Sequence, residues 1–226
     1  MKKTFIYISS IFIILFNFCQ TTPTYNIIAI GDSNGEHENG WVHQLKKIRP
    51  QDTIINYSIS GATIGFDNLG KDTLNTLKNI NTYLSDASKK VEKIDNIIVL
   101  LGTNDCKAVF DSLQDQVILN LEKLITEIQS YPFNQKNKPT ITLVTPPPIP
   151  NDSMLITKYQ GGKKRLENLL PVYKTIAKDY KCVFIDIYKP LAEDYLSLTV
   201  DGIHLNEEGY VKMAKIINDT LFKFMH

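Results

Sequence analysis

The sequence is poor in cysteine, histidine and net charge, and each shortage excludes a class of protein. Of its 226 residues, 3 are cysteine and 4 are histidine, and the formal net charge is +1. Three cysteines cannot form the framework of a small disulfide-rich domain, and a chain of this size buries enough apolar surface to fold without one. A charge near zero gives no electrostatic reason to expect a nucleic-acid partner. The sequence has no H-E-x-x-H motif or Cys/His cluster, so we expect neither a metal nor a cofactor.

The N-terminus predicts an exported protein. Lys2 and Lys3 precede an almost uncharged, strongly apolar stretch at residues 4–18. This stretch is shorter than the roughly 18 residues that a transmembrane helix needs, and its basic start is typical of a signal peptide. We therefore expect residues 1–19 to be a signal peptide and residues 20–25 to be a short linker.

Cys19 directly follows the apolar stretch, and this arrangement resembles a bacterial lipoprotein signal, in which such a cysteine is lipidated. Phe16 and Phe18 depart from that pattern, because lipoprotein signals usually have Leu and a small residue at these positions. We expect a membrane-anchored lipoprotein, periplasmic or at the cell surface, with secretion or an uncleaved anchor as alternatives. Several acyl chains on one cysteine would hold the protein stably at a membrane, at ~0.8 kcal/mol per buried methylene.

Downstream of the linker, short apolar runs alternate with segments in which apolar residues recur at helical spacing. The runs predict five strands, at residues 27–30, 53–59, 96–101, 140–144 and 183–187. The other segments predict helices at residues 41–48, 71–91, 112–129, 163–179 and 207–224, the fourth of which Pro171 could kink or split.

Such alternation predicts an α/β fold, in which a five-stranded parallel sheet is covered by helices on both faces. Ligands bind such sheets at the carboxyl ends of the strands, so the loops that follow the strands are the place to seek a site. Cys106 follows one strand and Cys182 begins another, so the sheet separates them by roughly 17–20 Å. We therefore expect no disulfide between them.

The first of these loops carries Gly31-Asp32-Ser33. A serine in this position can present its hydroxyl at the edge of the sheet, among the free N–H groups of a starting helix. The alternative is that Ser33 serves only as the N-cap of that helix, since serine is among the best residues there.

A nucleophilic serine needs a base, and a histidine base needs a carboxylate that fixes its tautomer. The segment Asp201-Gly202-Ile203-His204 supplies both within one turn, just before the last predicted helix. We expect the other three histidines to be surface residues, because none has an acidic partner at this spacing; they are His37, His43 and His226.

Two further loops offer hydrogen-bond donors. Gly61 follows the second strand and can bring its backbone N–H close to a ligand, and Asn104 follows the third strand with a side-chain amide. Acyl transfer needs such donors, aimed at the charge that develops on the carbonyl oxygen. Taken singly, both residues are explained as well by turn formation.

Taken together, Ser33, Gly61, Asn104 and the Asp201/His204 pair resemble the four motif blocks of the SGNH hydrolases, also called the GDSL family. The resemblance covers nearly the whole chain after the export segment, and GTND and DGIH are its most specific pieces. It implies that residues 26–226 form one domain with a three-layer α/β/α, flavodoxin-like fold.

The resemblance also implies the roles of the site residues. Ser33 would be the nucleophile, His204 the general base and acid, and Asp201 the residue that orients His204. The Ser33 N–H, the Gly61 N–H and the Asn104 side chain would form the oxyanion hole. Asn34 departs from the family, which usually has leucine there. This departure makes the prediction of a lipase less secure than the prediction of an esterase. We interpret Asp32 and Asp105 as structural.

The predicted function is therefore that of a serine esterase acting through an acyl-enzyme on a small-molecule or glycan ester. We expect short acyl groups, acetyl above all, on carbohydrate or aryl alcohols, because few insertions surround the motifs and little chain remains for a long acyl groove. One alternative is a lysophospholipase or thioesterase acting on longer chains. A more remote alternative is a non-catalytic, lipid-anchored glycan-binding protein.

Overall fold

The computed structural model describes residues 24–225. The predicted signal peptide, the lipidation site Cys19, most of the predicted linker and His226 lie outside the described residues. Within that range, no helix is both long enough and apolar enough to cross a membrane.

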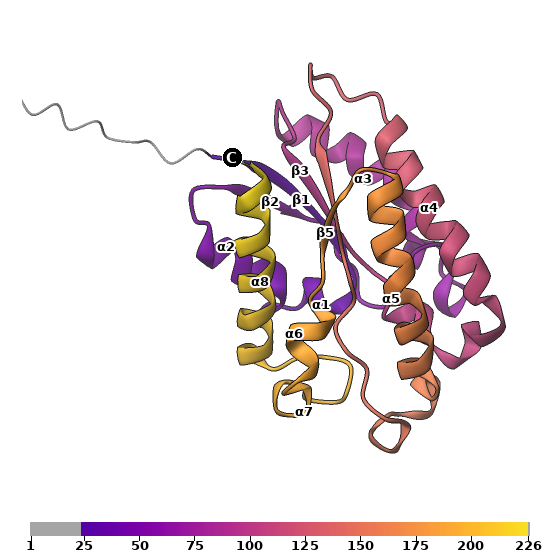
Figure 1. Ribbon diagram of the computed structural model, residues 1–226. Coiled ribbons are helices and arrows are strands. Elements are labelled where there is room, and N and C mark those ends of the chain that lie inside the picture. Colours follow the sequence, from indigo (N-terminus) through magenta and orange to yellow (C-terminus); the bar gives the residue numbers. More distant parts are fainter. Residues whose placement is uncertain (1–23, 226) are drawn as a thin grey trace, which may run out of the picture.

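The core of the fold is a parallel sheet of five strands (Figure 1). The strands are β1 (Asn26–Gly31), β2 (Thr53–Asn56), β3 (Asn96–Leu100), β4 (Thr140–Val144) and β5 (Val183–Ile185). Their spatial order is β2-β1-β3-β4-β5, and every neighbouring pair is parallel. This is the order of the flavodoxin-like doubly wound fold, so the predicted fold class is confirmed.

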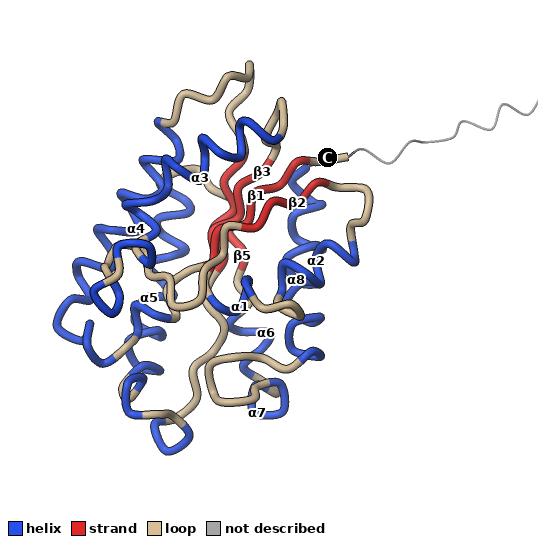
Figure 2. The backbone as a smooth tube through the Cα atoms, turned by 180° about the vertical axis from the view of Figure 1, so that it is seen from behind, coloured by secondary structure: helices blue, strands red, loops and turns tan. Residues whose placement is uncertain are grey.

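Helices cover both faces of the sheet (Figures 1 and 2). One face carries α2 (Trp41–Ile48), α8 (Glu207–Met225) and the short helices α6 (Tyr188–Ala192) and α7 (Tyr195–Leu198). The other face carries α3 (Thr76–Lys90), α4 (Gln114–Ser130) and α5 (Gly162–Asp179). The short helix α1 (Ser33–Glu36) follows β1 at the carboxyl end of the sheet.

Strand residues alternate between two cores, because successive side chains of a strand point to opposite faces. Ile28 and Ile30 of β1 pack with the α3, α4 and α5 side, whereas Ile27 and Ala29 pack with the α2 and α8 side. All four are fully buried. Burial on both faces explains why the central strands are apolar runs rather than alternating sequences.

The predicted elements are all present, with α2 and β4 at the predicted bounds, but several others are shorter than predicted, most of all β2 and α3. Strand β2 ends at Asn56, whose side chain accepts the Ser58 N–H at 3.0 Å and donates to the Gly35 carbonyl at 2.8 Å. Helix α3 begins at Thr76 because the Asn75 side chain caps it, accepting the Lys78 N–H at 3.1 Å.

Residues around these helices form short 3-10 turns that helical spacing does not reveal. They are η1 (Asn68–Gly70), η2 (Asp72–Leu74), η3 (Asn104–Cys106), η4 (Ala108–Leu113), η5 (Asp152–Met154) and η6 (Thr157–Tyr159). Pro171 lies inside α5 without splitting it, since α5 runs unbroken from Gly162 to Asp179. Cys106 and Cys182 are both free.

Candidate active site

Ser33 stands at the carboxyl end of β1, as the first residue of α1. Asp32, not Ser33, is the N-cap of this helix, because the Asp32 side chain accepts the Asn34 N–H at 3.0 Å. The reading of Ser33 as a mere helix cap is therefore wrong. Its hydroxyl instead lies 2.9 Å from Nε2 of His204, which comes from the other end of the chain.

His204 is held by Asp201 within a single tight turn. Nδ1 of His204 lies 2.7 Å from Oδ2 of Asp201, and the other carboxylate oxygen accepts the backbone N–H groups of Ile203 and His204, at 2.9 and 2.7 Å. Gly202, between them, has a φ of +85°, a conformation that favours glycine. An Nδ1–H directed at the carboxylate leaves Nε2 to accept the Ser33 proton.

The same turn keeps Asp201 ionised. Partial burial alone would raise the pKa of Asp201, but the backbone hydrogen bond from His204, the His204 ring and the Ile203 N–H outweigh it and lower that pKa. A carboxylate that stays charged stabilises the imidazolium formed when His204 takes up a proton. The arrangement thus suits proton transfer from Ser33.

Three candidate donors, from Ser33, Gly61 and Asn104, line the same pocket. Within the described chain, neither the Ser33 N–H nor the Gly61 N–H has a protein acceptor. Gly61 has a φ of +86°, which again favours glycine. The Asn104 side chain is 3% exposed and donates one Nδ2 hydrogen to the Ala62 carbonyl at 3.0 Å, which leaves its second hydrogen for a ligand.

Tyr159 determines which way the Asn104 amide points. Its hydroxyl donates to Oδ1 of Asn104 at 2.9 Å, so Oδ1 is engaged and the Nδ2 group is left to donate, to the Ala62 carbonyl and to a ligand. Tyr159 lies in η6, 55 residues further along the chain, and is 4% exposed. Nothing in the sequence signals this contact, because a lone tyrosine in a loop has no periodicity or motif.

Asp105 connects the loop after β3 by hydrogen bonds to the loop that carries Gly61. Both of its carboxylate oxygens lie 3.1 Å from the Ile64 N–H. Complete burial raises the pKa of Asp105 to about 7, although the Ile64 hydrogen bond opposes this rise. Burial likewise raises the pKa of Asp32. The contacts of Asp32 and Asp105 are structural, in line with their interpretation from the sequence.

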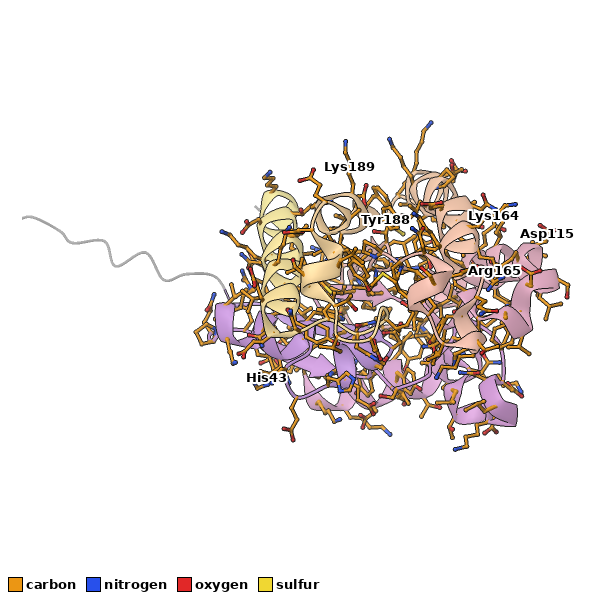
Figure 3. The ribbon with its side chains drawn as sticks, turned by 90° about the horizontal axis from the view of Figure 1, so that it is seen from below. His43, Asp115, Lys164, Arg165, Tyr188 and Lys189 are labelled. Carbon is orange, nitrogen blue, oxygen red and sulfur yellow. The ribbon has the colours of Figure 1, made fainter. Side chains whose placement is uncertain are left out.

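An open pocket surrounds Ser33, Gly61, Asn104 and His204. The rest of its wall is formed by His37, Ser60, Asn68, Leu69, Lys71, Thr73, Leu74, Lys107, Lys158 and Tyr159. His37 is exposed, as expected for a surface residue, but its ring packs edge-on against that of His204 at 5.1 Å between centroids. His43 is exposed on α2 (Figure 3), as predicted.

Comparison with known proteins agrees with this combination of fold, hydrogen-bonded Ser–His–Asp chain and neighbouring donors. The model of the GDSL-like Lipase/Acylhydrolase family matches residues 27–212. The chain belongs to this family. It is accordingly an esterase of the SGNH type, and the resemblance seen in the sequence is confirmed.

Named relatives of this esterase act on acetyl and aryl esters. Over 138 residues, 55% of its length, the chain is 30% identical to an acetylxylan esterase from Xylanibacter ruminicola, and spans 28% of that protein. A carbohydrate acetylesterase family member from Sinorhizobium meliloti has a TM-score of 0.72 at 22% identity, over 89% of this chain and 98% of its own. The M. smegmatis aryl esterase has a TM-score of 0.70 at 22% identity, over 88% and 99%.

Proposed function

We propose that this esterase removes short acyl groups, acetyl above all, from carbohydrate or aryl alcohols through an acyl-enzyme on Ser33. The observation that carries the mechanism is the continuous contact from Asp201 to His204 to Ser33, at 2.7 and 2.9 Å, in a pocket that Gly61 and Asn104 also line. These are distances at which proton transfer from a serine hydroxyl takes place.

The reaction follows from this geometry. His204 Nε2 takes the Ser33 proton while Oγ attacks the ester carbonyl carbon, and the negative charge on the carbonyl oxygen is stabilised by the N–H groups of Ser33, Gly61 and Asn104. The intermediate collapses as His204 returns the proton to the departing alcohol. Water, activated by the same imidazole, then attacks the acyl-enzyme and releases the acid and free Ser33.

The preference for acetyl esters is supported by the names of the relatives, of which one is an acetylxylan esterase and another a carbohydrate acetylesterase. The intact Ser33, Asn104 and His204 disfavour a purely glycan-binding role. The preference for short acyl groups and the sugar or aryl alcohol remain proposals.

One observation favours longer or aromatic acyl groups as a second candidate. An apolar groove that includes Leu69, Val109 and Phe110 adjoins the pocket, and the two share Asn68, Leu69, Lys107 and Lys158. Leu69 and Val109 are 80% and 71% exposed. Exposed apolar residues that line a groove are typical of ligand-binding surfaces.

Hydrolysis of p-nitrophenyl esters of increasing acyl length tests both candidates. We expect acetate to be the best substrate, and Ser33→Ala to lower kcat by several orders of magnitude, as removal of a triad serine does. Ser153→Ala, which removes an exposed hydroxyl in η5, is the matched control. Equal rates for Ser33→Ala and the wild type would refute the mechanism, and a maximum at long chains would favour the second candidate.

We also propose that the protein is exported and lipidated on Cys19. The support is the sequence of residues 1–19 alone. Incorporation of a labelled fatty acid into the wild type, but not into Cys19→Ala, is the expected result. Equal labelling of both proteins would contradict it.

A further inference from the structure

The pocket that contains Ser33 is lined by lysines and by no carboxylate. Lys71, Lys107 and Lys158 contribute to its wall, and none of its described lining residues is Asp or Glu. The carboxylate of Glu36, near the rim, is engaged by the Ser60 N–H at 2.8 Å. A substrate that enters this pocket therefore meets positive charge.

Lys107 is the most unusual of the three lysines. It follows Asn104-Asp105-Cys106 in the loop after β3, and it is only 6% exposed. No carboxylate of the described chain lies within 4.0 Å of its ammonium group, and no described acceptor hydrogen-bonds to it. Burial lowers the pKa of Lys107 to about 8, and the neighbouring charge of Lys158 acts in the same direction.

A second buried cation in the same region shows how this fold pairs a charge that has a structural role. Arg165 of α5 is 7% exposed and is fully engaged. It pairs with Asp111 at 2.6 Å, donates to the Cys106 carbonyl at 2.9 Å and donates to the Gln160 carbonyl. Buried charges are normally paired in this way, whereas the Lys107 ammonium has no carboxylate partner within 4.0 Å among the described residues and contacts only the face of the Tyr159 ring.

Lys107 and Lys158 converge on the residue that orients the oxyanion amide. Their Nζ atoms lie 5.7 and 5.5 Å from the centroid of the Tyr159 ring. The hydroxyl of that ring donates to Asn104 Oδ1 at 2.9 Å. Both ammonium groups thus lie around one side chain, in the pocket that also contains Ser33, and like charges held together attract an anion.

We propose that Lys107 and Lys158 bind an anionic group on the alcohol part of the substrate, so that the preferred substrates are acetylated acidic sugars. This inference rests on the proposed acetylesterase function, because an acetyl group is too small to carry the anion itself. The ligand chemistry is a sugar carboxylate or sulfate. An ammonium group binds either as a compact point charge, without the bidentate geometry that arginine would impose.

The test compares three acetylated sugars that differ only in the group at C6: a methyl glucuronoside, a methyl glucoside 6-sulfate and a neutral methyl glucoside. We expect kcat/KM to be at least about tenfold higher for one or both acidic sugars at low salt, and this preference to shrink as salt is added. The ratio between the carboxylated and sulfated sugars identifies which anion is bound.

Lys158→Gln should lower kcat/KM for the acidic sugars about tenfold more than kcat/KM for the neutral sugar, and Lys107→Gln should act likewise. Lys158 is exposed, so its variant keeps the test valid if Lys107→Gln fails to fold. Lys164→Gln is the matched control, because this exposed lysine lies on α5 outside the pocket lining (Figure 3).

Three results would overturn the inference. The first is equal kcat/KM for the acidic and neutral sugars in the wild type, and the second is an equal loss on both in Lys158→Gln. Preferred cleavage of an anionic lysophospholipid over all three sugars would also overturn it. Hydrolysis of p-nitrophenyl acetate that depends on Ser33 separates the two proposals, because its absence would refute the proposed function itself.

Discussion

The Tyr159 hydroxyl donates to Asn104 Oδ1 at 2.9 Å, and through this contact a loop residue controls the orientation of an amide at the candidate oxyanion hole. An amide that lacked this bond could turn its oxygen toward the developing oxyanion, which the partial negative charge of that oxygen would repel. Tyr159 is therefore a positioning residue, and the pocket depends on η6 as well as on the strand ends.

Tyr159→Phe should lower kcat about fivefold with little change in KM, because the amide loses one neutral hydrogen bond of about 1 kcal/mol that fixes its orientation. Asn104→Ala should cost more, about 10²–10³ in kcat, since it removes the oxyanion donor itself. Steady-state kinetics on p-nitrophenyl acetate measure both. Tyr188→Phe is the control, because that hydroxyl donates to the Glu167 carboxylate on the surface. An unchanged kcat in Tyr159→Phe would refute the positioning role.

Asp201→Asn should lower kcat by about 10³–10⁴-fold while the fold survives. The asparagine can still accept the Ile203 and His204 N–H groups through its oxygen, but its NH2 group faces Nδ1 of His204 and favours the wrong tautomer. Kinetics together with thermal unfolding measure the two effects separately. A loss of activity that merely follows a loss of folded protein would argue against this role.

Selectivity for acidic sugars should fall as the pH rises through about 8, where Lys107 loses its proton. The sign follows from the lowered pKa, because the ammonium form exists below that value and the neutral amine above it. The charged groups that act on Lys107 are Lys158, which lowers its pKa, and Asp105 and Asp32, which raise it. Competitive inhibition by glucuronate, measured from pH 6.5 to 9.5 against methyl glucoside as control, checks this prediction. Inhibition that is independent of pH in this range would contradict it.

The pKa of Asp105, raised by burial from 3.8 to about 7, should make folding stability depend on pH. Between these values the folded chain keeps a proton that the unfolded chain has released, so the stabilising contribution is complete below about 3.8 and is lost as the pH rises to about 7. Asp105→Asn should flatten this slope without removing it, because burial raises the pKa of Asp32 as well. Urea unfolding at pH 5 and pH 7.5 measures the change. An equal slope in the variant would show that Asp105 is ionised throughout.

Local patterns determined most of the fold. Apolar runs marked the strands, and turn residues after them marked the edge at which a site could form, because parallel strands bring their carboxyl ends together. The Asp201/His204 pair was also visible, since both residues belong to one turn. Element ends were less predictable. Helix α3 begins at Thr76 because the Asn75 side chain caps it, whereas its apolar spacing fits a start at Lys71 equally well.

Contacts between distant segments were decided by the tertiary structure alone. Ser33 and His204 are 171 residues apart, and their pairing was expected only because a family motif links them. No such motif marks Tyr159 against Asn104, Lys107 beside Lys158, or His37 against His204. Hydrophobic burial sets the strand order, and the strand order sets which loops meet. A sequence therefore shows which residues can do chemistry, whereas the packing of the sheet decides which of them share one pocket.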